Sequence, residues 1–89
     1  MTDYHELTDS EINSAVSQHV SPNLPRRYCE TPAGAWPVIT FNLIAVEPVY
    51  KGQQMWLAHA GDDGEFRCLH ENPLRAAMTV YLKIKEAKG

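Results

Sequence analysis

The chain has 89 residues, of which 44% are hydrophobic and 21% charged, and its formal net charge is −3 at pH 7. This length predicts a single domain, residues 1–89, with one modest core. The slightly acidic balance argues against a general phosphate-neutralising nucleic-acid binder. No stretch is apolar for long enough to span a membrane, and the acidic start, without Lys or Arg before Arg26, is unlike a signal peptide. We therefore expect a cytosolic protein in which Cys29 and Cys68 are free thiols.

The first predicted element is a helix over residues 7–20. Thr8 and Glu11 have the spacing of a capping box, in which each side chain bonds the other residue's backbone N–H. Apolar residues then recur at helical spacing along one face. Residues 21–31 are predicted to be a loop, because two prolines prevent a continuous helix.

A second helix is predicted from Pro32 to about Leu43. Proline suits the first turn of a helix, where its missing N–H has no partner to lose. We expect Trp36 to lie on the buried face of this helix. Pro37 opposes the helix, and the alternation of apolar and polar residues over 39–43 also fits a strand. We favour the helix and keep the strand as the alternative.

Three strands are predicted next, over residues 44–50, 54–59 and 65–70. Pro48 cannot donate a hydrogen bond to a neighbouring strand, which places the first strand at an edge of the sheet. A glycine-containing hairpin loop joins the other two, with residue 60 opposite residue 65. In this register one face of the hairpin is mainly apolar, and we expect it to be the core face. It holds Met55, Leu57, His59, Phe66, Cys68 and His70.

The last predicted element is a helix with a strong start signal. Asn72 is a favoured N-cap residue and Pro73 a favoured first helical residue. The fold class predicted for the whole chain is α+β, in the order α-α-β-β-β-α. Its three strands form an antiparallel sheet with helices packed on it.

Two segments carry a resemblance to a known family. The residues Tyr28-Cys29, Pro32 and Ala35-Trp36-Pro37, with the run from His70 to Met78, resemble the small bacteriophage proteins of the NinX type. The opening from Asp3 to Asn13 also fits the start of that family, whose function is undefined. The resemblance covers most of the chain and implies a phage or prophage origin and an α+β sandwich. It implies no catalytic residues.

A metal site is the first chemical possibility. Cys29, His59, Cys68 and His70 are residue types that bind zinc, but their spacing matches no usual zinc-ligand pattern. The predicted register also separates His59 from His70 along the hairpin by about 13 Å, at roughly 3.3 Å per residue. We therefore predict no metal and no cofactor.

Catalysis by a cysteine is the second possibility. Cys29 follows Arg26 and Arg27, whose positive charges would lower its pKa and make it more reactive. A cysteine enzyme also needs a base, an oxyanion site and a pocket, for which so short a chain has little material. We therefore predict that the protein is not an enzyme.

Arg75 suggests a third possibility, because a cation in the first turn of a helix opposes the helix dipole. Either Arg75 contacts Glu71, or it joins the N–H groups at the helix start in binding an anion or a partner's carboxylate.

Binding of a partner protein is the fourth possibility. Trp56 projects from the face opposite Met55 and Leu57, so it is core if a helix covers that face and marks a binding patch if none does. The edge strand offers strand addition or self-pairing, which makes a homodimer possible. The residues predicted to contact a partner are Arg26, Arg27, Tyr28, Trp56 and Arg75.

We therefore expect a non-catalytic phage or prophage accessory protein that binds a host protein in the host cytoplasm. Inhibition of a host defence or regulatory system is the activity that the phage resemblance favours. The alternative is a protein that binds a small ligand or nucleotide through Arg75 and the start of the last helix.

Overall fold

The computed structural model describes residues 3–20, 27–50 and 52–88. Its elements are η1 (Tyr4–Glu6, a 3₁₀ helix), α1 (Asp9–Val20), α2 (Pro32–Phe41), β1 (Ala45–Tyr50), β2 (Gln54–Ala60), β3 (Phe66–His70) and α3 (Pro73–Lys88). The predicted α+β class and the order of helices and strands are confirmed.

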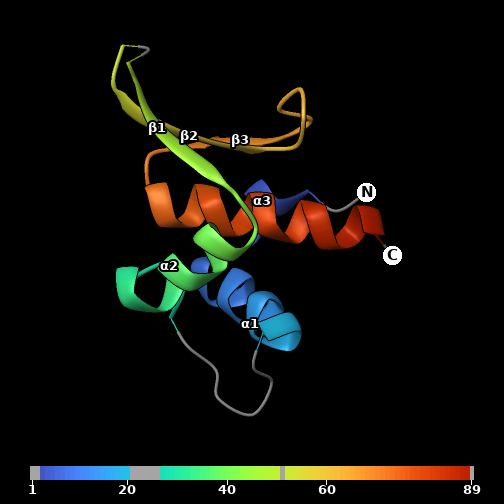
Figure 1. Cartoon of the computed structure of the whole chain (residues 1–89). Helices are drawn as coiled ribbons and strands as arrows, with labels where there is room; N and C mark the ends of the chain where they lie inside the picture. The colour runs from blue at the N-terminus through green and yellow to red at the C-terminus, as the bar shows by residue number, and fades with distance from the viewer. Residues whose placement is uncertain (1–2, 21–26, 51, 89) are drawn as a thin grey trace.

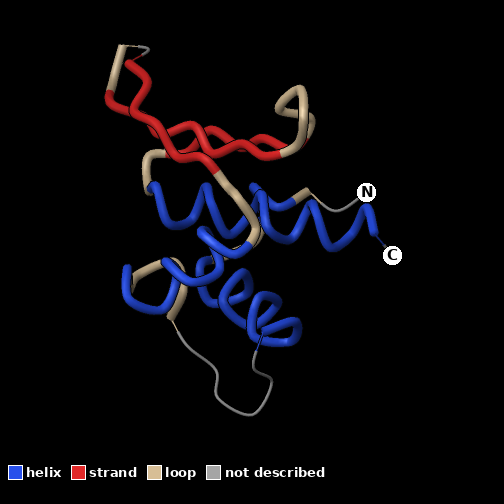
Figure 2. The backbone as a smooth tube through the Cα atoms, in the orientation of Figure 1, coloured by secondary structure: helices blue, strands red, loops and turns tan. Residues whose placement is uncertain are grey.

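The elements form three layers, which Figures 1 and 2 show from the same side. The antiparallel sheet has the strand order β1-β2-β3 and packs with one face on α3. On the opposite side of α3 lie α1 and α2. The helices are thus stacked on one side of the sheet, and no described residue covers its other face (Figure 1). The phage resemblance implies an α+β sandwich with helices packed on the sheet. In the structure, helices cover one face of the sheet and not the other.

The middle layer, α3, forms the centre of the core. Ala76, Ala77, Met78 and Val80 are completely buried because the helix has the sheet on one side and two helices on the other. From α1, Ile12 and Val16 join this core, and both are also completely buried.

The start of α1 has the predicted capping box. The Thr8 N–H donates to Oε1 of Glu11 at 2.9 Å, and the Glu11 N–H donates to Oγ1 of Thr8 at 3.1 Å. Two helical N–H groups without intrahelical partners are thereby satisfied at the point where the helix begins.

The helix predicted after residue 32 is confirmed as α2, and the strand alternative is wrong. Pro37 lies inside the helix. The helix ends in a Schellman motif, in which the Ile44 N–H donates to the Ile39 carbonyl at 3.0 Å and the Leu43 N–H donates to the Thr40 carbonyl at 3.3 Å. This motif turns the chain directly from α2 into β1.

The predicted hairpin register is wrong by one residue. Ala60 lies opposite Phe66 and Ala58 lies opposite Cys68, because five residues rather than four separate the strands. A shift by one residue moves the side chains of one strand to the other face. The core face of the hairpin therefore holds Trp56, Ala58, Ala60, Phe66, Cys68 and His70. The prediction was right for β3 and wrong for β2, whose alanines are the residues that approach α3.

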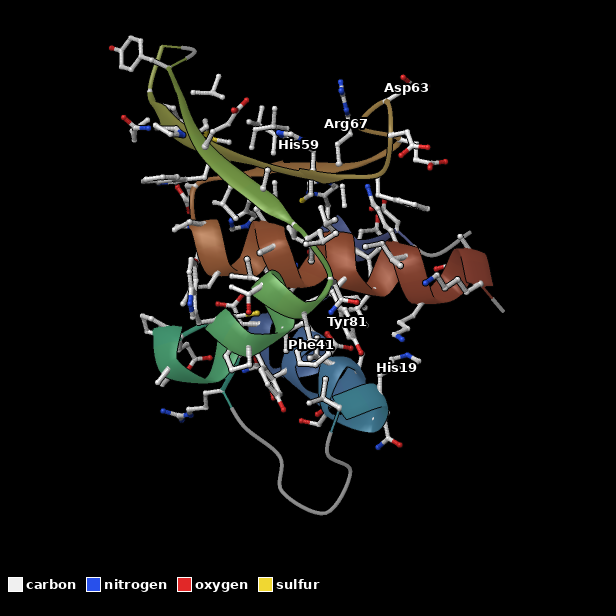
Figure 3. All side chains as sticks on the ribbon, viewed as in Figure 1. His19, Phe41, His59, Asp63, Arg67 and Tyr81 are labelled. Atoms are coloured by element: carbon white, nitrogen blue, oxygen red, sulfur yellow. The ribbon has the colours of Figure 1, made fainter. Side chains whose placement is uncertain are left out.

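The opposite side of the sheet, which we call the outer face, includes Met55, Leu57 and His59 of β2 with Arg67 and Leu69 of β3. Figure 3 shows His59 and Arg67 on the side of the sheet away from α3. The predicted edge position of β1 is confirmed by the strand order.

In the part of the chain that the structure describes, no helix combines the length and apolar character that crossing a membrane requires.

Candidate functional site

The most exposed large apolar side chains of the helical layer gather on α2 and the turn that follows it. Trp36 is 64% exposed, Phe41 90% and Leu43 85%. The expectation that Trp36 lies in the core is wrong, because α2 contacts α3 through Ala35, Val38 and Ile39 instead.

A groove of about 370 Å³, open to solvent, runs between α2 and the start of β1. Its floor is formed by Ile39 and Ile44, which are 5% and 6% exposed, and its rim by the exposed Trp36 and Leu43. We call this feature the α2 groove, and its lining consists of Trp36, Ile39, Thr40, Leu43, Ile44 and Val46. Phe41 follows Thr40 about 100° further around the helix and lies outside the groove lining, on the side of α2 away from the sheet (Figure 3).

The α2 groove contains almost no polar chemistry. Residues 31–46 include no charged side chain and no histidine. The lining has two polar side-chain groups: the Thr40 hydroxyl, which donates back to the Trp36 carbonyl at 3.0 Å, and the indole N–H of Trp36. The groove therefore offers a ligand a hydrophobic surface and shape, with no cation, anion or free side-chain amide.

The composition of α2 differs from that of an ordinary surface helix. Such a helix has an apolar stripe toward the core and polar residues toward water. In α2 the exposed positions include Trp36 and Phe41, so apolar residues surround the helix. An apolar helix with no polar face is typical of a helix that is covered on all sides. In this structure α3 covers only one side of it.

Leu43 combines two unfavourable features. Its φ angle is 52°, in the left-handed region, where it is the one described residue other than glycine. The Schellman position it occupies is usually glycine, and a side chain there costs about 1–2 kcal/mol. The side chain is also 85% exposed, so burial within the chain recovers little of that cost. The turn from α2 into β1 needs this left-handed backbone but not a leucine, and a residue held in a costly conformation without compensating burial is characteristic of functional positions.

Arg75 is not available for binding in the way we predicted. Its side chain is 7% exposed, and Nη1 pairs with Oδ1 of Asp9 at 2.6 Å. Nη2 donates to the carbonyls of Tyr4, at 2.9 Å, and of Leu7. Arg75 thus fastens the N-terminal segment to α3, and this corrects both the proposed contact with Glu71 and the proposed anion site.

The N-terminus of α3 is also occupied from within the chain. Oδ1 of Asn72 accepts from the backbone N–H of Leu74 at 2.9 Å and from that of Arg75 at 3.3 Å. Asn72 acts as the predicted N-cap. These two N–H groups are therefore already satisfied, which removes the structural basis for the small-ligand alternative.

The other predicted contact residues do not form one surface. Arg26 lies outside the described residues. Arg27 is exposed and pairs with Glu30 at 3.4 Å, whereas Tyr28 is only 1% exposed. Trp56 is half-buried on the core face of the sheet, so the interpretation of Trp56 as a covered residue is the one that the structure favours.

The cysteines are unsuited to nucleophilic chemistry. Burial raises the pKa of Cys29 to about 12, and the nearby Asp9 carboxylate adds to this effect. The prediction of a lowered pKa is wrong because burial outweighs the attraction of nearby cations. Burial also raises the pKa of Cys68.

The predicted zinc-ligand types are dispersed. His59 lies on the outer face of the sheet and His70 on the core face. Within residues 3–20, 27–50 and 52–88, no three His, Cys, Asp or Glu side chains are grouped closely enough to hold a metal ion.

The sequence contains a signal for the α2 groove that the predicted contact residues do not reflect. Residues 31–46 lie between Glu30 and Glu47 without any charge, although the segment is predicted to contain a helix. A helix of that composition in so small a domain predicts an apolar surface that the domain itself cannot cover.

Comparison with known proteins gives no relative: no protein-family model, no curated protein and no solved structure matches the chain. The resemblance to NinX-type phage proteins stays a prediction. The function is therefore inferred from the surface described above.

Proposed function

We propose that the protein acts without catalysis, by binding another protein whose apolar segment enters the α2 groove. The observation that carries this proposal is Leu43, an exposed leucine held at a left-handed φ of 52°. Glycine would suit the backbone at this position, and a polar side chain would suit its exposure. A bound partner that buries Leu43 explains why neither occurs.

The lining of the groove defines the chemistry of the partner. With no charge over residues 31–46, the groove has no ionic partner for a phosphate, a carboxylate or an ammonium group. Nucleic acids and nucleotides are disfavoured ligands, because their binding depends on cations and hydrogen bonds. An uncharged protein segment with apolar side chains is favoured, since it loses little hydration when it enters.

Trp36 is the expected anchor of the interface. It is a large, exposed aromatic residue at the rim of a groove with a buried floor. Tryptophans in such positions contribute a large share of the binding free energy in protein interfaces. Leu43 adds apolar area at the rim itself, and Phe41 adds exposed apolar area on α2 outside the groove lining.

The phage resemblance extends the proposal to the partner's origin. We propose that the partner is a host protein in the host cytoplasm, and that its capture inhibits a host defence or regulatory system. This part rests on the residues quoted for the resemblance, whereas the binding surface rests on the geometry of α2.

Replacing Leu43 by glycine separates binding from folding. We expect Leu43→Gly to stabilise the chain by up to about 1 kcal/mol, because glycine relieves the left-handed strain and little burial is lost. We expect the same variant to weaken partner binding about tenfold or more, the change typical of losing an interface anchor. Urea denaturation measures the first effect and titration with the purified partner the second.

The partner for this titration is obtained by affinity capture from bacterial lysate. The variant Trp56→Phe leaves Trp36 as the single tryptophan, so its fluorescence reports burial of the groove directly. Leu43→Asn is a second variant that tolerates the left-handed backbone but presents a polar side chain. Tyr50→Ser is the matched control, because Tyr50 is 75% exposed but lies at the far end of β1.

Three results would contradict the proposal. The first is unchanged affinity in Leu43→Gly and Leu43→Asn, and the second is a loss of stability in Leu43→Gly, which would give Leu43 a role in the fold. The third is an unchanged Trp36 emission when the partner binds. A captured partner unrelated to defence or regulation would remove the inhibitory role and leave the binding surface intact.

A further inference from the structure

We propose that the outer face of the sheet is the surface through which two copies of this chain associate. This surface is separate from the α2 groove, because the groove's one strand residue, Val46, lies opposite Ala58 on the core face of the sheet, and the outer face is the other side. The proposal therefore stands or falls independently of the proposed function.

The outer face has an apolar centre. Leu57 on β2 lies opposite Leu69 on β3, and Met55 on β2 lies opposite Val49 on β1. All four side chains are partly exposed, and no described helix or strand lies over this face (Figure 1). Antiparallel sheets normally turn polar residues toward water on the face that carries no helices. The centre of this face departs from that pattern, as expected for a surface that is covered in a complex.

The charges on this face are arranged so that it complements itself. Glu47 on β1 lies opposite Leu57, and Arg67 on β3 lies opposite His59, one step along the same face. The acidic residue is thus on one edge strand, β1, and the basic residue is on the other edge strand, β3, with β2 between them. Both side chains are exposed. Within the chain, Oε2 of Glu47 lies 4.0 Å from Nε2 of His59, and Nε of Arg67 donates to the Gly64 carbonyl at 3.1 Å, so each keeps its exposed position while making one weak contact.

A second copy is the occupant that this arrangement fits. The two copies are related by a two-fold axis that runs parallel to β2, midway between the two sheets. This axis places Leu57 against Leu57 of the second copy, and it places β1 of one copy over β3 of the other. Glu47 of each copy then lies near Arg67 of the other copy, so the interface contains two such acid–base pairs. Symmetric interfaces require such self-complementarity, whereas a different partner protein would not. Face-to-face sheets pack about 10 Å apart, which long side chains span.

The expected dimer is weak. Three strands spaced about 4.8 Å apart provide a small contact area. Interfaces with a small buried area are typical of transient complexes. We therefore expect a dissociation constant in the micromolar range or above.

Sedimentation velocity over a wide range of protein concentrations tests the proposal. The unmodified chain is expected to shift from monomer to dimer as concentration rises. Leu57→Glu places two like charges at the symmetry axis and is expected to keep the chain monomeric. Leu43→Gly, in the α2 groove, is the control that leaves the dimer unchanged.

A charge-reversal series provides variants at exposed positions, where folding is not at risk. Glu47→Arg and Arg67→Glu each turn the attractive pair into a like-charge pair, and each is expected to weaken self-association about tenfold. Mixed with each other, these two variants are expected to form a heterodimer, because every acidic position of one then faces a basic position of the other.

Several outcomes would overturn the proposal. One is a chain that stays monomeric at all concentrations. Another is a dimer that persists in Leu57→Glu but is lost in Leu43→Gly, which would place self-association at the α2 groove. Failure of the two mixed charge variants to pair would also reject the proposed orientation.

Discussion

The helices α2 and α3 are both rich in apolar residues, but the fold uses them in opposite ways. Nine residues of α3 are buried, because this helix lies between the sheet and the other two long helices. In α2 only Ala35, Val38 and Ile39 are buried, and Trp36 and Phe41 face solvent. The apolar residues of α3 therefore stabilise the fold, whereas half of those in α2 stay exposed and contribute little to it.

This contrast shows how to separate structural from functional apolar residues. Burial of an apolar side chain stabilises the folded state by removing its surface from water. Phe41 and Leu43 gain almost nothing from this effect, because they are 90% and 85% exposed. Leu43 in addition carries backbone strain. The cost of keeping such residues is understandable if a partner covers them.

The largest expected effect is on stability, and it distinguishes the two helices directly. Met78→Ala leaves a cavity at a completely buried position of α3, so we expect a loss toward the upper end of about 2–5 kcal/mol. Phe41→Ser on α2 removes a side chain that is already in water, and we expect a change within about 0.5 kcal/mol. Urea denaturation of both variants measures the difference. Comparable losses would show that α2 contributes to the core as α3 does.

The next effect concerns the contact that fastens the N-terminal segment to α3. Arg75→Met removes the cation that holds Asp9 and the carbonyls of Tyr4 and Leu7, and we expect a loss of about 3 kcal/mol. Asp9→Asn retains an oxygen acceptor and is expected to cost less, since Asp9 is 43% exposed. Binding at the α2 groove should survive in the folded fraction of both. Equal and negligible losses would contradict the role assigned to Arg75.

The smallest expected effect is a pH dependence that acts on α3 and not on α2. Burial, reinforced by Arg75, lowers the pKa of His70 from its usual 6.5. Nδ1 of His70 accepts from the backbone N–H of Asn72, the N-cap of α3, and only the unprotonated nitrogen does so. As the pH falls, His70 is therefore protonated in the unfolded chain before it is protonated in the folded chain. Its contribution to the free energy of unfolding is complete above pH 6.5 and declines as the pH falls below that value.

Urea midpoints measured at several pH values between about 5 and 8, the range in which histidine titrates, test this prediction. His70→Gln is expected to lose this component of the pH dependence. His19→Gln is the control that retains it. His19 lies in the last turn of α1 and contacts Tyr81 in the middle of α3, so it does not touch the N-cap of α3. An identical pH profile in His70→Gln and the unmodified chain would reject the assignment.

Local signals in the sequence determined most of the secondary structure. Two helix starts depend on hydrogen bonds between near neighbours: the capping box of Thr8 and Glu11, and the Asn72-Pro73 start of α3. The edge position of β1 depends on the hydrogen bond that Pro48 cannot donate. Such interactions are decided within a few residues of the chain. They are therefore visible without the tertiary structure.

Only the tertiary structure decided which apolar surfaces are covered. One extra residue in the hairpin loop turned Ala58 rather than Leu57 toward α3. The packing of α2 on α3 left Trp36 exposed, and the stacking of all long helices on one side of the sheet left Leu57 only partly buried. The sequence also could not show that Arg75 reaches Asp9, 66 positions away. Burial depends on the partners that a residue meets across the fold, and hydrophobicity alone does not specify whether a partner is present.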